Sequence, residues 1–378
     1  MKLETACIHG SKDISSTTGA VCTPIYQSAT FAHPGVGQSA GYDYSRLQNP
    51  TREQLENIVA GLENGVDAIA FSSGMAAIST FMELFSPDDG VIASDDLYGG
   101  SVRLFDNIST KNGIKIDYVD TSIVEEISEK ITEKTKAIFI ETPTNPMMKV
   151  TDIAAVKELI GNRDIILAVD NTFLTPYFCR PLALGADVVI HSGTKYLGGH
   201  NDTLAGFLVT DREDVSEKLR FIHKTKGACL APFDSYLLIR GIKTLAIRME
   251  RAQENAIKLA TWLQTQKKVK TVYYAGLPTH EGIEISKKQG TGFGAMISFE
   301  TDTKETAHQI LDKTKLIIFA ESLGGVETLI TYPILQTHAD LPAERREKIG
   351  ITDKLLRISV GIENVEDLIE DLSAALAD

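Results

Sequence analysis

Short apolar runs alternate with amphipathic stretches between about residues 66 and 210 of the 378-residue chain. The runs are rich in β-branched and aliphatic residues without a polar alternation, which is typical of strands buried on both faces of a parallel sheet. The seven expected strands are Ala68–Phe71, Gly90–Ala93, Lys115–Val119, Ala137–Ile140, Ile165–Val169, Asp187–Ile190 and Ala205–Val209. Amphipathic stretches such as Asp152–Ile160 predict helices between them. The pattern therefore indicates an α/β fold with a mostly parallel sheet.

The segments on either side of this region show different patterns. Residues 1–50 are rich in Thr, Ser, Gly and Tyr and only weakly periodic, so we interpret them as an arm that lies on another surface. A helix is expected over Glu53–Ala60, with Thr51 as its N-cap. Residues 51–240 then form the large domain and residues 241–378 a smaller α+β domain. The later elements expected are helices over Tyr236–Leu245, Ala252–Leu263 and Val365–Leu376, and strands over Thr271–Tyr274, Ala295–Phe299, Leu316–Phe319 and Leu355–Ser359.

Composition and charge argue against several classes of protein. The chain is 43% hydrophobic and 24% charged, as is ordinary for a globular protein. The 51 acidic and 38 basic residues give a net charge of −13, which disfavours nucleic-acid binding. No apolar run approaches the roughly 20 residues of a membrane helix, and the N-terminus lacks the apolar segment of a secretory signal. The four widely spaced cysteines do not suggest a disulfide framework, so we expect a cytoplasmic protein.

Polar residues follow the carboxyl ends of the predicted strands, where parallel sheets bind their ligands. Ser72-Ser73-Gly74-Met75 follows the first strand and opens a helix, whose N–H groups and dipole suit a phosphate, although the same small residues also suit tight packing. Asn145 follows another strand end. His191 and His200 lie close in sequence but lack a metal-ligand pattern, so no zinc site is expected.

Asp170 and Lys195 are the candidate catalytic pair. They are 25 residues apart, one β-α-β step, which predicts neighbouring strand ends. Partial burial would lower the pKa of the lysine and make it a nucleophilic amine able to form a Schiff base. A phosphate-binding loop, an amine and a buried acid at one edge match the needs of pyridoxal phosphate. Two alternatives stay open: a cofactor-free Schiff-base lyase acting on a sugar phosphate, and a cofactor-binding protein without activity.

Six stretches of the chain, in this order, carry a resemblance to one enzyme family. They are Tyr44-Ser45-Arg46 with Asn49-Pro50-Thr51-Arg52, Ser72-Ser73-Gly74-Met75-Ala76, Asp96-Leu97-Tyr98-Gly99-Gly100, Glu141-Thr142-Pro143-Thr144-Asn145-Pro146, Val169-Asp170-Asn171-Thr172 and Ser192-Gly193-Thr194-Lys195-Tyr196. From about Thr5 to Ala375 the chain resembles the Cys/Met-metabolism family of pyridoxal-phosphate enzymes. The resemblance implies a type I aminotransferase-like fold and a homotetramer built from catalytic dimers.

The resemblance also implies a role for each candidate residue at the cofactor. Lys195 would form the internal aldimine with pyridoxal 5'-phosphate and move protons, Asp170 would pair with the pyridine nitrogen, and Tyr98 would stack on the ring and assist proton transfer. Asn145 would meet the phenolic oxygen of the ring. The remaining cofactor-binding groups are the backbone of Gly74 and Met75, the hydroxyls of Ser192 and Thr194, and, from a neighbouring subunit, Tyr44 and Arg46.

For the substrate, the resemblance implies that Arg357 binds the α-carboxylate with help from Ser322 and Asn145. Asp43 and Glu321 are acids expected beside the substrate channel, where they suit the distal ammonium of cystathionine or of attacking cysteine. The alternative interpretation of these two acids is that they are solvated charges at the rim.

Few positions bear on the choice of reaction. Gly100 stands where methionine γ-lyases commonly carry a cysteine, which disfavours that activity. Residues 201–202 and 232–234 look like the γ-synthase branch, whereas residues 350–353 look equally like bacterial γ-lyases. We therefore expect an enzyme of transsulfuration acting at the γ-carbon, interpreted first as a cystathionine γ-synthase that joins O-acyl-homoserine and cysteine. The alternatives are a cystathionine γ-lyase, a β-lyase and an O-acetylhomoserine sulfhydrylase.

Overall fold

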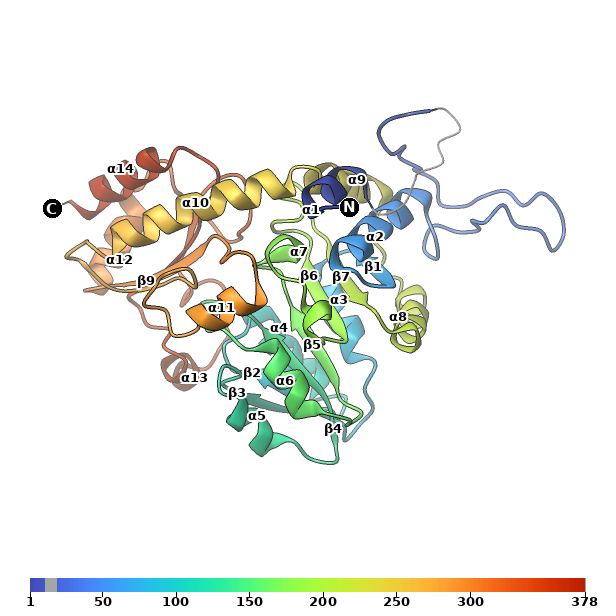
Figure 1. Cartoon of the computed structure of the whole chain (residues 1–378), viewed down its shortest axis with the longest axis horizontal. Coiled ribbons are helices and arrows are strands. Elements are labelled where there is room, and N and C mark those ends of the chain that lie inside the picture. The colour runs from blue at the N-terminus through green and yellow to red at the C-terminus, as the bar shows by residue number, and fades with distance from the viewer. Residues whose placement is uncertain (11–18, 378) are drawn as a thin grey trace.

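The computed structural model describes residues 1–10 and 19–377, and its largest element is a seven-stranded sheet (Figure 1). In order across the sheet the strands are β1 (Asp67–Phe71), β7 (Gly206–Thr210), β6 (Val188–Ser192), β5 (Ile166–Asp170), β4 (Thr135–Glu141), β2 (Gly90–Ser94) and β3 (Lys115–Val119). Strand β7 is antiparallel to both of its neighbours, and the other paired strands are parallel. The predicted mostly parallel sheet is confirmed, and the ends of all seven expected strands lie within two residues of the observed ones.

Helices cover both faces of this sheet, which explains why its strands are apolar without alternation. Successive residues of β4 serve opposite faces: Ile138 and Ile140 pack in one core cluster, Ala137 and Phe139 in the other. The first cluster includes residues of α2 (Pro50–Glu63), α5 (Val124–Lys130), α6 (Ile153–Ile160) and α7 (Thr175–Phe178), and the second includes residues of α3 (Gly74–Met82), α4 (Gly99–Leu104) and α8 (Glu213–Lys226). Shorter helical turns follow at Phe105–Ser109 and Pro181–Leu184.

A second, five-stranded sheet lies beyond the long helix α10 (Leu245–Leu263), which follows α9 (Pro232–Ile242). Its order is β10 (Ile318–Phe319), β11 (Leu329–Thr331), β12 (Leu355–Ser359), β9 (Met296–Thr301) and β8 (Val269–Tyr273). The remaining helices here are α11 (Ile283–Gln289), α12 (Lys304–Lys313), α13 (Ala343–Lys348) and α14 (Val365–Leu376). The prediction missed the three-residue strand β11, which is too short to show a pattern. The domain boundaries themselves stay a prediction.

The N-terminal segment contains two different parts. Helix α1 (Leu3–His9) packs on α2 and α10 of the same chain. Residues 19–48 instead lead away from the body as an extended loop, drawn in blue in Figure 1, with one bridge between Thr30 and Tyr44. Among the described residues, no helix has both the length and the apolarity needed to span a membrane.

Helix α2 begins earlier than predicted, and its N-cap is Asn49 rather than Thr51. The Asn49 side chain accepts hydrogen bonds from the N–H groups of Thr51 and Arg52 at 3.0 and 3.4 Å, and Pro50 occupies the first helical position. Proline has no N–H to satisfy and a backbone angle suited to a helix start, so the helix begins at Pro50 and its cap is the residue before it. The Thr51 hydroxyl instead donates to the carbonyl of Pro24 at 2.8 Å.

We expect Asn49→Ala to lower the midpoint of thermal unfolding by more than a cap alone accounts for. Loss of an N-cap costs about 1 kcal/mol, and the buried Asn49 amide also donates to Tyr26 and Ser45. The matched control is Asn364→Ala, since Asn364 caps α14 from an exposed position. Calorimetry of both variants checks this. An equal decrease of the unfolding midpoint in the two would show that the contacts of Asn49 to the arm contribute no stability.

Candidate active site

A cavity of about 380 Å³ opens at the carboxyl ends of the parallel strands. The small sheet closes its other side through residues 321–323 and through Arg357 on β12. Most of the residues singled out from the sequence line this one cavity: Gly74, Met75, Tyr98, Asn145, Asp170, Ser192, Thr194, Lys195, Glu321, Ser322 and Arg357. The structure therefore brings together groups that are up to 283 positions apart (357 − 74).

Lys195 lies in the loop that follows β6. Its Nζ donates to Ser322 Oγ at 3.0 Å. Burial and, to a lesser extent, the Arg357 cation lower the pKa of Lys195 to about 8, although the Glu321 carboxylate opposes both effects. The neutral amine, which is the nucleophilic form, is therefore accessible near physiological pH.

The backbone of Ser322 is strained. Its φ of 142° lies in a region that residues with a side chain rarely adopt. Its carbonyl accepts from Arg357 Nη2 at 3.1 Å, and its hydroxyl accepts from Lys195. Such strain persists where surrounding contacts hold it, and it concentrates at functional sites.

Asp170 ends β5, beside the end of β6 that leads to Lys195. Its Oδ1 accepts from the N–H and the hydroxyl of Thr172, at 3.0 and 2.6 Å. Burial raises the pKa of Asp170, and the two bonds from Thr172 and the nearby His191 oppose that rise. Because both hydrogen bonds from Thr172 reach Oδ1, the other carboxylate oxygen of Asp170 is available to a cationic or N–H group of a bound molecule.

Glu141 is a buried carboxylate that the sequence interpretation did not include among the site residues. It ends β4 directly opposite Asp170 in the sheet, and it accepts from the N–H of Tyr98 at 2.9 Å. Burial raises the pKa of Glu141 well above its usual value, and the Asp170 charge adds to the rise. Its position immediately after an apolar run was a signal that could have identified it. We interpret Glu141 as a group that orients Tyr98.

One part of the cavity is suited to a phosphate, because the start of α3 lies close to β6 and β7 there. Ser73 caps α3 by accepting from Ala76 N–H at 3.1 Å. A Cβ on Gly206 would lie 2.2 Å from the Ser73 carbonyl oxygen, and one on Gly74 would lie 3.1 Å from Ser192. Because both positions are glycine, the start of α3 lies against the Ser192 hydroxyl. Helix N–H groups and a hydroxyl at one point suit an anion.

Arg357 is a buried cation, and one of its N–H donors has no hydrogen-bond partner. It is 1% exposed, and its Nη1 donates to Asn145 Oδ1 at 2.8 Å while Nη2 also reaches Thr331 Oγ1 at 3.2 Å. Its Nε has no hydrogen-bond partner. Burial lowers the pKa of Arg357 to about 10, so the guanidinium stays charged at neutral pH. A buried, incompletely bonded guanidinium is suited to a carboxylate of a bound molecule.

Three predicted site residues, Asp43, Tyr44 and Arg46, do not line the cavity. They lie on the exposed arm, where Arg46 donates to the carbonyl of Lys224 and stacks 5.6 Å from the centre of the Tyr44 ring. Their expected contact concerns a neighbouring subunit and stays a prediction. Cavity-lining residues that the sequence interpretation did not single out include Ile78, Thr172, Phe173, Leu204, Leu323 and Thr337.

Comparison with known proteins gives one consistent result. The family described as "Cys/Met metabolism PLP-dependent enzyme" matches residues 4–377. A cystathionine gamma-lyase of Bacillus subtilis (strain 168) is 50% identical over 376 residues, 100% of this chain and 99% of that protein. A cystathionine beta-lyase of Lactococcus lactis subsp. cremoris (strain MG1363) is 49% identical, covering 99% and 98% of the two chains. A cystathionine gamma-synthase/O-acetylhomoserine (thiol)-lyase of Bacillus subtilis (strain 168) is also 49% identical, over 95% and 92%.

The solved structures agree with the fold. The crystal structure of cystathionine gamma-lyase from Lactobacillus plantarum, complexed with L-serine, superposes with a TM-score of 0.97. The two chains are 44% identical, and the match covers 99% of this chain and 98% of that one.

We expect the rate at which the apoprotein takes up pyridoxal phosphate to rise with pH and to level off near pH 8, rather than near 10.5. The Glu321 carboxylate raises the pKa of Lys195 and the Arg357 cation lowers it. Glu321→Gln should therefore shift the profile to lower pH and Arg357→Met to higher pH. Stopped-flow absorbance in matched buffers measures the three profiles. The cofactor's own titrations affect the wild type and both variants equally, so a difference between the profiles reports on the protein. Identical profiles would show that Lys195 does not limit the uptake.

Proposed function

Because the chain belongs to the Cys/Met metabolism PLP-dependent enzyme family, and is thus a pyridoxal-phosphate enzyme, we propose that it acts at the γ-carbon of a transsulfuration substrate. The reaction that we assign first is that of a cystathionine γ-synthase, which joins O-acyl-homoserine and cysteine. The observation that carries the proposal is the position of Glu321. This acid lines both the inner cavity and an outer one of about 720 Å³, which Asp202 and Asp234 also line. An acidic outer cavity suits the distal ammonium of cystathionine or the ammonium of an attacking cysteine.

The residues of the inner cavity fit the cofactor. Lys195 would bind its aldehyde covalently, and Asp170 would accept a hydrogen bond from the protonated pyridine nitrogen. When bound, the cofactor supplies an electron sink for charge that develops on the amino acid. Tyr98, which is 39% exposed, offers a ring face for stacking. The backbone of Gly74 and Met75 and the hydroxyls of Ser192 and Thr194 would hold the phosphate, and Asn145 would meet the phenolic oxygen.

The substrate is oriented by charge at both ends. Arg357 binds the α-carboxylate through its unpartnered Nε and an Nη, with Ser322 and Asn145 beside it. Glu321 binds the distal ammonium, and Asp43 approaches it from a neighbouring subunit. Lys195 would be the group that carries a proton between carbon atoms of the substrate, since its amine lies in the cavity beside Ser322. Glu141 holds the backbone of Tyr98 through its N–H, and the Tyr98 phenol would assist proton transfer.

The assembly that we propose is a cytoplasmic homotetramer built from catalytic dimers. The arm leads away from its own body, and Tyr44 and Arg46 are exposed and do not line the cavity of their own chain. In a catalytic dimer these two residues reach the cofactor phosphate of the neighbouring subunit.

A cystathionine γ-lyase is the second candidate, favoured by the 50% identical relative of that name. Assays run side by side separate the possibilities. O-acetyl- or O-succinyl-homoserine with cysteine should yield cystathionine. Cystathionine alone yields cysteine, 2-oxobutyrate and ammonia by γ-elimination, or homocysteine, pyruvate and ammonia by β-elimination. We expect the synthesis to have the highest kcat/KM, and a higher value for either elimination would reassign the enzyme to that lyase.

We expect Lys195→Ala to abolish the visible absorbance of the covalently bound cofactor and essentially all turnover. The matched change is Asp170→Asn, which should keep the cofactor bound but reduce the rate by orders of magnitude, because an amide does not stabilise a protonated ring nitrogen. Absorbance spectra and steady-state rates check both. An unchanged rate in either variant would remove that residue from the proposed mechanism.

We expect Glu321→Ala to raise KM for cystathionine or cysteine several-fold and to leave simple elimination from O-acetylhomoserine nearly unchanged. A partly screened ammonium–carboxylate contact contributes about 1 kcal/mol, and added salt should reduce the difference. The control is Glu305→Gln, which removes an exposed charge on α12. Equal damage to every substrate would mean that Glu321 positions Ser322 or Lys195 instead of selecting substrates.

A further inference from the structure

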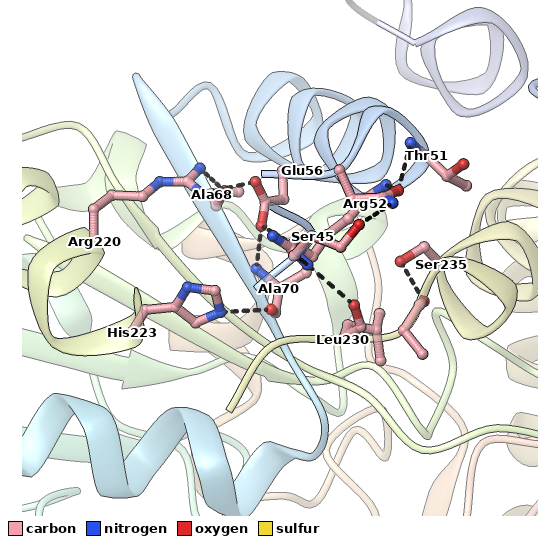
Figure 2. Close-up of polar contacts among 12 residues, drawn as sticks. Ser45, Thr51, Arg52, Glu56, Ala68, Ala70, Arg220, His223, Leu230 and Ser235 are labelled. Atoms are coloured by element: carbon pink, nitrogen blue, oxygen red, sulfur yellow. Dashed lines mark hydrogen bonds and ion pairs between the residues drawn. The ribbon is translucent and has the colours of Figure 1, made fainter. Parts of the chain in front are cut away.

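A network of charges, buried at Arg52 and Glu56 and half-buried at Arg220 and Asp67, lies outside the cavity, between the start of α2 and the outer edge of β1 (Figure 2). Arg52 on α2 is 2% exposed, and its Nε lies 3.7 Å from Glu56 Oε1. Glu56 Oε2 accepts from Arg220 Nη1 at 2.8 Å, and Arg220 binds both oxygens of Asp67 at 2.9 and 2.6 Å. Glu56 thus has two cationic partners, and two cations face two carboxylates.

The two ends of this network hold different parts of the molecule. Glu56 accepts from the N–H of Ala70 at 2.9 Å, on the edge strand that leads into the loop at Ser73. His223 meets the carbonyl of the same residue at 3.2 Å. This end of the network satisfies the free edge of β1 and so serves the cavity of its own subunit.

Arg52 holds the arm instead. Its Nη1 donates to the carbonyl of Ser45 at 2.7 Å and reaches the carbonyl of Leu230 at 3.4 Å. Ser45 lies between Tyr44 and Arg46, the two arm residues assigned above to a neighbouring phosphate. Figure 2 shows the guanidinium between Ser45, Leu230 and Glu56. The arm is also tied down at its root, where Asn49 Nδ2 donates to the carbonyl of Tyr26 at 2.9 Å.

Removal of Arg52 should therefore affect the arm at Ser45 more than strand β1. Glu56 would keep its ion pair with Arg220 and its bond to Ala70, so β1 and the loop after it stay supported. The carbonyl of Ser45 would lose its bond to a buried cation. A buried guanidinium can serve here because the Glu56 carboxylate offsets the cost of its desolvation.

We propose that Arg52 is a positioning residue for the active site of the neighbouring subunit: it fixes the arm at Ser45 so that Tyr44 and Arg46 reach that subunit's cofactor phosphate. The inference rests on the proposed function, in which the arm acts across the dimer. Its distinctive consequence is that the damage caused by losing Arg52 appears in the partner's site and not in the site of the same chain.

Complementation between subunits tests this. Arg52→Met, which fills the space without a donor, should weaken pyridoxal-phosphate binding at least tenfold in the homo-oligomer. Co-expressed with Lys195→Ala, it forms mixed dimers in which one site combines an intact Lys195 with an intact arm. With random pairing, about one quarter of the wild-type sites should recover both visible absorbance and turnover, because half of the dimers are mixed and each has one complete site. Cofactor titration followed by absorbance measures binding independently of turnover.

Two control pairs separate the inference from the function on which it rests. Arg46→Ala with Lys195→Ala should complement, and Asp170→Asn with Lys195→Ala should not, because both of those residues serve their own subunit. If the Arg46 pair recovers and the Arg52 pair does not, Arg52 acts within its own subunit and the inference is wrong. If neither recovers, the arm does not act across the dimer and the proposed assembly fails first.

A second variant keeps the test decisive if Arg52→Met does not fold. Arg52→Lys keeps a charge beside Glu56 but lacks the guanidinium fork, so it should lose cofactor affinity less severely and recover in the same complementation. Wild-type cofactor affinity in both variants, with unfolding midpoints that match the wild type, would overturn the positioning role.

Discussion

The structure depends on one buried cation that joins its two sheets. Arg357 lies on β12 of the small sheet, and it bonds both to Asn145, in the loop that follows β4 of the large sheet, and to the strained Ser322. Together with residues 321–323 it forms the wall of the cavity that faces the ends of the parallel strands. A buried guanidinium is expensive unless its donors are used. The cation therefore both holds the sheets in register across the cavity and keeps one donor for a ligand.

One feature of the sequence allowed the prediction both of the large sheet and of the site residues that follow its strands. A strand buried on both faces leaves an unmistakable apolar run, and a polar residue directly after it must lie at the ligand-binding edge. Asp170 and Lys195 follow from this argument, and Glu141 would have followed too had its position after β4 been weighed. The family resemblance added roles for these residues that periodicity alone does not contain.

The rest depended on contacts that no local pattern records. Strand β12, which carries Arg357, was predicted with its observed ends, but no pattern along it indicates that Arg357 meets Asn145 and Ser322 across the cavity. Strand β11 was missed altogether. The start of α2 shows that even a local prediction can be wrong. Asn49 and Thr51 are both residue types that form N-caps, and Asn49 is the cap because Pro50 takes the first helical position. Arg52 carried no chemical signal in the sequence beyond its place in a motif, because its partners Ser45 and Leu230 are brought to it only by the fold.

The extended arm makes cofactor binding depend on the concentration of the protein. When one chain completes the cofactor site of another, the cofactor and the neighbouring chain act as ligands that strengthen each other, and linkage makes the two effects equal in free energy. Cofactor occupancy then falls as the protein concentration falls toward the dimer dissociation constant, even with free cofactor held constant. Conversely, a shortage of the vitamin from which the cofactor is made would reduce the assembled enzyme as well as its catalysis.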